Sequence, residues 1–307
     1  MDAEARPAAE QGYERIGPTA WGIAYRRTFF DIPHSREIFH ELQRIMEPPE
    51  LTPELEDERA SAHDLQFEAR FRLVSRLLKE KGADQVLEIA SGFSPRGLIL
   101  AQDPSITYVE LDLQGILRAK RDIVEKLVQQ SKVRRQSNLH FWEGNALAVQ
   151  DLQGAARIFR DRPIAVIHEG LLRYLSFQEK ALMAENIHRL LERFGGVWIT
   201  PDISVRKKGF SVADEKTKEQ NLREQRMTGI DLTKNRFDSE EAAFRFFEGL
   251  GFRVERHSFM EVADELVLPQ RLNLSREQVA ERIGRSIAFA MRLPQCSYGV
   301  RTARLMA

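Results

Sequence analysis

The stretch from Gln85 to Leu113 constrains the fold of this chain most strongly. It begins with an apolar run, Val86–Ala90, which is typical of a buried strand, and continues with a loop of small residues, Ser91–Pro95. After a short apolar helix, a second apolar run leads to an acidic residue, Asp112. A strand, a tight turn, a helix and a second strand that ends in a carboxylate form half of a nucleotide-binding α/β fold.

The loop after the first strand indicates what kind of ligand this fold accepts. Gly92 has no Cβ, so the backbone can approach a ligand closely there. A pyrophosphate loop carries the pattern G-x-G-x-x-G, whereas this loop has only Gly92 and Gly97. Glu88 adds a negative charge beside the loop, which repels phosphate and favours a cation. We therefore expect a positively charged ligand without phosphate, whose ribose is bound by Asp112.

Three segments resemble a known family: VLEIASGFSPRG from Val86, YVELD from Tyr108 and HEGLLRYL from His168. They are similar to the leucine carboxyl methyltransferase family and its bacterial polyketide O-methyltransferase relatives. The similarity extends over nearly the whole chain and is weakest at residues 204–235. The resemblance implies S-adenosyl-L-methionine (SAM) as the cofactor and S-adenosyl-L-homocysteine (SAH) as its product. SAM carries a sulfonium, an ammonium and a ribose but no phosphate, which agrees with the charges around the loop.

The resemblance also implies an α/β fold class. The fold that the resemblance implies is that of the Rossmann-like class I methyltransferases, with a seven-stranded, mostly parallel sheet, helices on both faces and an N-terminal helical cap. Periodicity alone supports a doubly wound sheet. We expect residues 1–81 to form an N-terminal tail and the helical cap, and residues 82–307 to form the SAM-binding methyltransferase domain. A polar, helix-prone excursion at about 204–235 is expected to lie over the active site.

Turn signals separate the remaining expected elements. The expected strands are Ile106–Leu111, Leu139–Trp142, Ile164–Ile167, Val197–Thr200, Phe252–Phe259 and Cys296–Leu305. The expected helices are Ser35–Met46, Ser61–Lys81, Arg96–Ala101, Gly115–Gln130, Asp151–Arg160, Phe177–Phe194, Ser239–Leu250 and Ser275–Arg292. Ser176 and Glu179 predict a capping box, and Asp238 is expected to cap a later helix.

Composition excludes several classes of protein. Lys and Arg together number 46, as do Asp and Glu, so no net field attracts nucleic acid or an anionic membrane. The single cysteine, Cys296, permits neither an internal disulfide nor a Cys-based zinc site, and we expect no metal. No window approaches the roughly 18 apolar residues of a membrane span. The acidic N-terminus lacks the apolar core of a signal peptide, so we expect a cytoplasmic protein.

Ligands of open α/β sheets bind at the carboxyl ends of the strands, where this chain carries several polar residues. The predicted cofactor site there consists of Glu88, Ser91, Gly92, Asp112, Asn145 and Glu169. The resemblance implies that Asp112 binds the ribose and that Asn145, where the family usually has Asp, binds the adenine edge. The structural alternatives are a helix cap for Asp112 and a turn for Asn145.

Glu169 directly follows an apolar strand, where an unpaired charge is costly to bury. The resemblance implies that this acid binds the methionyl amino group. It also implies that Arg70 binds the methionyl carboxylate, because a guanidinium holds a carboxylate through two hydrogen bonds, and Arg27 is the second candidate. Glu88 is explained equally well as a ligand contact or as part of a structural ion pair. Lys120 is expected to be a solvated surface residue.

Methyl transfer from a sulfonium depends on alignment and desolvation of the acceptor. A carboxylate acceptor needs no general base, whereas a hydroxyl acceptor does. We assign no catalytic residue; the candidate bases are His34, His63, His168 and Tyr174. Aromatic residues that either contact the acceptor or fill the core are Trp21, Tyr25, Phe29, Phe30 and Phe210.

The predicted function is therefore SAM-dependent O-methylation of a small molecule, at a carboxylate or a hydroxyl. A nicotinamide-dependent oxidoreductase on a Rossmann fold is a second hypothesis, against which the glycine pattern and Glu88 argue. A non-catalytic methyltransferase-like partner protein is a third. Binding of SAH or of NAD(H) distinguishes the first two, and loss of all SAM binding indicates the third.

Overall fold

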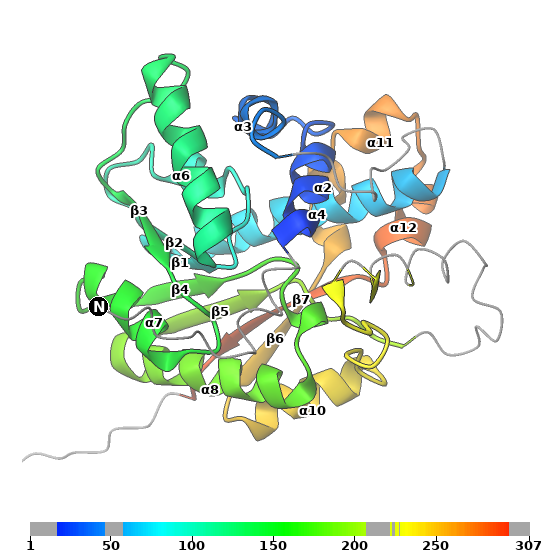
Figure 1. The fold of residues 1–307 in the computed structure, drawn as a ribbon. Helices are drawn as coiled ribbons and strands as arrows, with labels where there is room; N and C mark the ends of the chain where they lie inside the picture. Colours follow the sequence, from blue (N-terminus) through cyan, green and yellow to red (C-terminus); the bar gives the residue numbers. More distant parts are fainter. Residues whose placement is uncertain (1–16, 47–57, 207–221, 223–224, 227, 295–307) are drawn as a thin grey trace, which may run out of the picture.

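Figure 1 shows the computed structural model, which describes residues 17–46, 58–206, 222, 225–226 and 228–294. A seven-stranded sheet in the order β3-β2-β1-β4-β5-β7-β6 forms its centre. The strands are β1 Gln85–Ile89, β2 Thr107–Asp112, β3 Leu139–Glu143, β4 Ile164–Ile167, β5 Gly196–Thr200, β6 Arg253–Ser258 and β7 Ile287–Arg292. β7 runs antiparallel to β5 and β6, and the other neighbours pair in parallel. The seven-stranded, mostly parallel sheet is confirmed.

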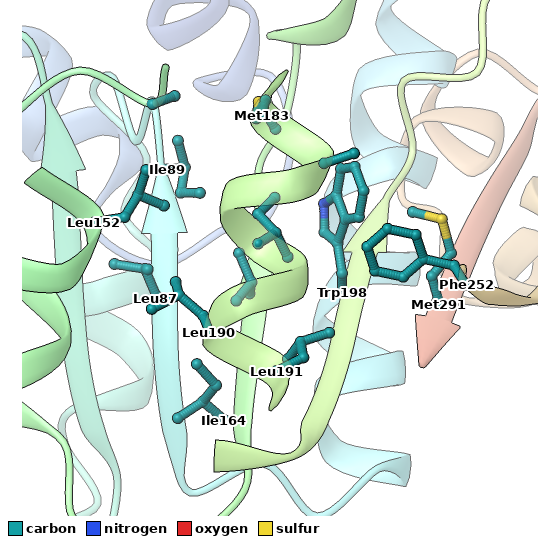
Figure 2. Close-up of a cluster of buried hydrophobic side chains, with 14 of the residues drawn as sticks. Leu87, Ile89, Leu152, Ile164, Met183, Leu190, Leu191, Trp198, Phe252 and Met291 are labelled. Carbon is teal, nitrogen blue, oxygen red and sulfur yellow. The ribbon is translucent and has the colours of Figure 1, made fainter. Parts of the chain in front are cut away.

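Helices cover both faces of the sheet, because successive residues of a strand point to opposite sides. Leu87 and Ile89 of β1 belong to the core on one face. The helices of this face, in the lower half of Figure 1, are α7 Val149–Ala155 with the 3₁₀ turn η2 Ala156–Ile158, α8 Phe177–Phe194 and α10 Glu240–Gly249. Figure 2 shows this core, in which the rings of Trp198 and Phe252 lie 5.4 Å apart.

The opposite face carries Val86 of β1 and a second core. Its elements are α4 Glu58–Glu80, the 3₁₀ helix η4 Phe259–Glu265, α11 Leu268–Arg271 and α12 Arg276–Ile283. α5 Arg96–Leu100 and α6 Gln114–Gln129 pack beside β2 and β3. Because Leu73 of α4 shares this core with Ile199 of β5, α4 covers the sheet. The division between cap and domain at residue 81 stays a prediction.

The cap helices α2 Gly17–Arg27 and α3 Ser35–Leu42 form a third core with α6. Trp21 lies 5.7 Å from the ring of Tyr25 and 5.0 Å from that of Phe39. Phe93, in the loop after β1, belongs to the same cluster. The aromatic side chains of α2 therefore anchor the cap directly on the loop that is predicted to bind the ligand.

The predicted helix Ser275–Arg292 is wrong in its second half. α12 ends at Ile283, and residues Ile287–Arg292 form β7 instead. β7 lies between β5 and β6 and is buried except for its last residue, so its apolar run lacks the alternation of a half-exposed strand. Its two alanines and its methionine favour a helix locally, and tertiary packing overrides that preference.

The capping box of Ser176 and Glu179 is confirmed, whereas the later helix is capped by Ser239 and not by the predicted Asp238. The tail, the strand predicted at Cys296–Leu305 and most of the excursion at 204–235 lie outside the described residues. Among the helices that the structure describes, none combines the length and the apolar character that crossing a membrane requires.

Candidate active site

The loop after β1 brings three of the predicted site residues together. Gly92 has a φ of +52°, and its N–H donates a hydrogen bond of 2.6 Å to Asp112 Oδ2 at the end of β2. Ser91 Oγ is buried without a hydrogen-bond partner. Ala20 of α2 lies above this loop, with its Cβ 3.5 Å from the place that a Cβ on Gly92 would take. The loop after β1 is therefore packed between the end of β2 and the cap helix α2.

Asp112 is buried at this junction, with 8% of its surface exposed. Its Oδ1 accepts the N–H of Leu113 at 2.7 Å. Leu113 is the N-cap of α6, so the alternative of Asp112 as a side-chain cap is not observed. Burial raises the pKa of Asp112 to about 6, although the N–H groups of Gly92 and Leu113 oppose the shift. Both hydrogen bonds come from the backbone, and a carboxylate has further lone pairs for ligand hydroxyls.

Glu88 is fully engaged in a structural ion pair. Its Oε1 accepts from Arg96 Nη1 at 2.9 Å, and its Oε2 accepts from the hydroxyl of Tyr108 at 2.8 Å. Only 1% of Glu88 is exposed. Of the two interpretations of this residue, the structural pairing is therefore observed, and its negative charge stays beneath the loop.

Three arginines from three different helices surround the carboxylate of Glu169. Arg96 of α5 pairs with Oε1, while Arg27 of α2 and Arg70 of α4 approach Oε2 at 3.2 and 3.4 Å. Burial raises the pKa of Glu169, but these guanidinium groups outweigh it and hold the pKa at about 2. The predicted pair of Glu169 and Arg70 thus lies together, and Arg27, the second candidate, lies beside it.

Arg96 is a central residue that sequence reasoning missed, because it stands in an otherwise apolar run. It is 1% exposed and joins Glu88 of β1 to Glu169 after β4. It also donates to the carbonyl of Phe71 at 3.2 Å, and its guanidinium lies 4.2 Å from the ring of Phe71. The sequence does contain a signal for this pair, because Arg96 is the one charged residue of its apolar helix and Glu88 is the acid of the preceding strand.

Asp202, two residues after β5, was also missed. It accepts the N–H groups of Gly170 and Leu171 at 2.7 and 2.8 Å, and it lies 3.7 Å from Arg70. The cluster therefore holds three acids against three arginines: Glu88, Glu169 and Asp202 against Arg27, Arg70 and Arg96. Asp112 stands next to this balanced set with backbone partners, so its negative charge favours a cation.

Asn145 follows β3 and forms a turn. Its Oδ1 accepts the N–H of Leu147 at 2.9 Å, and its own N–H donates to Asp151 at 2.8 Å. This is the structural alternative that the sequence left open. Its predicted contact with the adenine edge stays a prediction.

The family model of the leucine carboxyl methyltransferases matches residues 33–188, just over half of the 307 residues. The chain belongs to the leucine carboxyl methyltransferase family. The match includes the loop after β1, the end of β2 and the turn that carries Glu169, where the buried acids lie.

Solved structures share the fold of this family member at low identity. A DUF574 family protein from Streptomyces avermitilis has a TM-score of 0.51 and 18% identity, with 90% of this chain and 97% of that chain covered. A candidate methyltransferase from Thermobifida fusca has a TM-score of 0.51 and 16% identity, with 85% and 89% covered. An O-methyltransferase family protein from Burkholderia thailandensis has a TM-score of 0.43 and 15% identity, with 78% of this chain and 60% of that chain covered. The chain therefore spans less than two thirds of that protein. No curated protein sequence matches the chain significantly.

Together, the strand order and the two structures with a TM-score of 0.51 confirm the Rossmann-like class I methyltransferase fold.

Lys120 of this family member is not solvated, so the prediction that it is a solvated surface residue is wrong. It is fully buried and forms an ion pair with Glu110 of β2. Burial raises the pKa of Glu110 to about 7, and the charge of Lys120 opposes the rise. Lys120 continues the buried helical spacing of Leu117 and Val124, which outweighs the basic run around it.

The candidate bases and aromatic residues occupy different environments. His168 is fully buried, and His34 lies in a left-handed conformation with its Nε2 3.1 Å from Gln102 Nε2. Trp21 and Phe30 are buried in the core at 3% and 2% exposure, which agrees with the second of the two roles considered for them. Tyr174 is buried at 8% exposure, Tyr25 and Phe29 are half-buried, and the side chains of His63 and Phe210 lie outside the described part.

Two grooves among the described residues lie away from these strand ends. One of about 370 Å³ is lined by residues of β6 and β7: Arg253, Val254, Glu255, Ala290 and Arg292. The strand-end acids are packed instead, because α2 spans them through Ala20 at the loop and Arg27 at Glu169. A ligand that reaches both Asp112 and Glu169 therefore displaces contacts of α2.

Proposed function

We propose that this protein is a SAM-dependent methyltransferase that methylates an oxygen of a small molecule, at a carboxylate or a hydroxyl. The observation that carries the proposal is the pair of buried acids at the carboxyl ends of β2 and β4, on either side of β1. The strand order reverses at this point, which is where open α/β sheets bind their ligands. Membership of the leucine carboxyl methyltransferase family supports the same chemistry.

The residues of this site fit SAM. The N–H of Gly92 already donates to Asp112, so it is not free to hold a phosphate, whereas Asp112 can still accept ribose hydroxyls. The balanced cluster of arginines and acids suits a zwitterion. We assign the methionyl ammonium to Glu169 and the methionyl carboxylate to Arg70, with the buried and unpaired Ser91 Oγ as a further polar contact. Glu88 acts through Arg96 and does not contact the ligand.

Bound SAM would supply the methyl group on an electrophilic sulfonium. The protein then has to orient the methionyl end, exclude water and align the acceptor. Arg27 belongs to the cap helix α2, whereas Arg70 and Arg96 belong to helices packed on the sheet, so the cluster can fix the cofactor between cap and sheet. A carboxylate acceptor is ionised at neutral pH and requires no proton transfer, whereas a hydroxyl acceptor requires a base.

Calorimetric titration with SAH and with NAD(H) tests the proposal. We expect SAH to bind, NAD(H) not to bind, and SAM to be converted to SAH when a panel of small carboxylic acids and phenols contains the acceptor. Binding of NAD(H) without SAH would support an oxidoreductase instead. Binding of neither ligand would support a non-catalytic role.

The affinity for SAH is expected to fall in acid. The carboxylate of Asp112 must be ionised to accept two ribose hydroxyls, and in the free protein its pKa is about 6. As the pH falls through 6, Asp112 takes up a proton that binding must remove. The dissociation constant is therefore expected to rise about tenfold from pH 7 to pH 5.

Calorimetric titrations between pH 5 and pH 8 check this expectation. Glu110 titrates near pH 7 and faces the same region, together with Glu88 and Lys120. Asp112→Asn is therefore the control, because it should flatten the profile between pH 5 and pH 7 while leaving any contribution of Glu110. An equal affinity of the unchanged protein at pH 5 and pH 7 would contradict the role of Asp112.

A further inference from the structure

Asp202 and His168 hold the turn that carries Glu169. Oδ1 of Asp202 accepts the N–H of Gly170 at 2.7 Å, and Oδ2 accepts that of Leu171 at 2.8 Å. Oδ2 also lies 3.0 Å from Nδ1 of His168. Asp202 therefore bonds to the residue before Glu169 and to the two residues after it, with its own side chain only 3% exposed.

These bonds fix the direction of Glu169. Neighbouring residues at a strand end point to opposite faces, and the ring of His168 lies 5.8 Å from that of Trp198 on the α8 side. Glu169 accordingly points to the α4 side, where it meets the arginines. Gly170 has a φ of +79°, which favours glycine, and its N–H in this conformation donates to Asp202.

We propose that Asp202, together with His168, is a positioning residue for cofactor binding. It sets the carboxylate of Glu169 where the methionyl ammonium of SAM binds, and it does not touch the cofactor itself. Asp202 also lies 3.7 Å from Arg70, beyond hydrogen-bond distance, so we assign its effect to Glu169. This inference rests on the proposed function.

Asp202→Asn is the first test. The new NH₂ group cannot accept a hydrogen bond, so one of the N–H groups of the turn or the ring of His168 loses its partner. We expect the affinity for SAH, measured by calorimetry, to fall about tenfold. In a Glu169→Gln background the same change should alter the affinity less than about twofold, because Asp202 acts through Glu169. In an Asp112→Asn background the two losses should multiply.

His168 supplies a second pair of variants if Asp202→Asn does not fold. His168→Asn keeps a donor close to the position of Nδ1 and should bind SAH within about twofold of the unchanged protein. His168→Leu removes that donor and should bind about five- to tenfold more weakly. Normal affinity in Asp202→Asn, or a loss that multiplies fully with Glu169→Gln, would overturn the positioning role. Failure of the unchanged protein to bind SAH would instead contradict the proposed function.

Discussion

Replacing Arg96 by methionine is expected to lower the free energy of unfolding by about 3–5 kcal/mol, because it breaks a buried network of charges. Arg96 is paired with Glu88 and Glu169, each of which is at most 4% exposed at its side chain. Methionine fills a similar volume but leaves both carboxylates buried without this cation. It also removes one of the donors to the carbonyl of Phe71, which keeps its hydrogen bond from the hydroxyl of Ser75.

Urea denaturation followed by circular dichroism measures this loss. Arg118→Met is the matched control, since Arg118 is 62% exposed at its side chain and its pair with Glu143 spans 3.5 Å. The control should lose less than about 1 kcal/mol. Adding Glu88→Gln to Arg96→Met should recover part of the loss, because it removes the charge of Glu88, whereas Glu169 keeps Arg27 and Arg70 as partners. A loss for Arg96→Met as small as that of the control would show that the network does not stabilise the fold.

Glu169→Gln is expected to weaken SAH binding by about 1.5–3 kcal/mol, or about 10- to 150-fold. The amide removes the negative charge that faces the methionyl ammonium. It also removes the charge that Arg27 and Arg70 now approach at 3.2 and 3.4 Å, so these two guanidinium groups repel the ammonium more strongly. The carboxylate of SAH still binds to an arginine, so the affinity is reduced and not abolished.

Calorimetry at pH 7.5 compares this variant with Glu192→Gln, whose residue lies on α8 with its side chain 61% exposed. The control should bind SAH as the unchanged protein does.

Asp112→Ala should weaken SAH binding by about 1–3 kcal/mol, because it removes one charged hydrogen-bond partner of the ligand. Unchanged titration curves for both Glu169→Gln and Asp112→Ala would show that the cofactor does not bind at these strand ends.

The strand ends could be predicted from the sequence because their signals are local. An apolar run followed by Asp112, or by His168 and Glu169, shows both the strand and the acid at its end. The partners of these acids could not be read locally, because they come from distant parts of the chain. Arg96 is 73 residues from Glu169, and Asp202 is 32 residues from Gly170. The sequence therefore identifies Glu169 as a charge in need of a partner but not the three arginines around it, and its contact with the methionyl ammonium stays a prediction.

The errors have the same origin. Lys120 was expected in solvent because its neighbours are basic, although its helical spacing already placed it on the buried face. β7 reads as a helix because a strand buried on both faces shows no alternation, and only its neighbours β5 and β6 decide its conformation. For both Lys120 and β7, the position in the fold overrides the environment or conformation that the neighbouring residues in the sequence suggest.

The position of β7 has a consequence for how the chain reaches this structure. The ribosome makes β6 before the strand that attaches it to the rest, since β7 separates β6 from β5. A nascent chain that stops short of Ile287 leaves β5 with an open edge and β6 without any neighbour in the sheet. The sheet is therefore completed only after β7 has been made, and until then its open edge is exposed to aggregation and to chaperones.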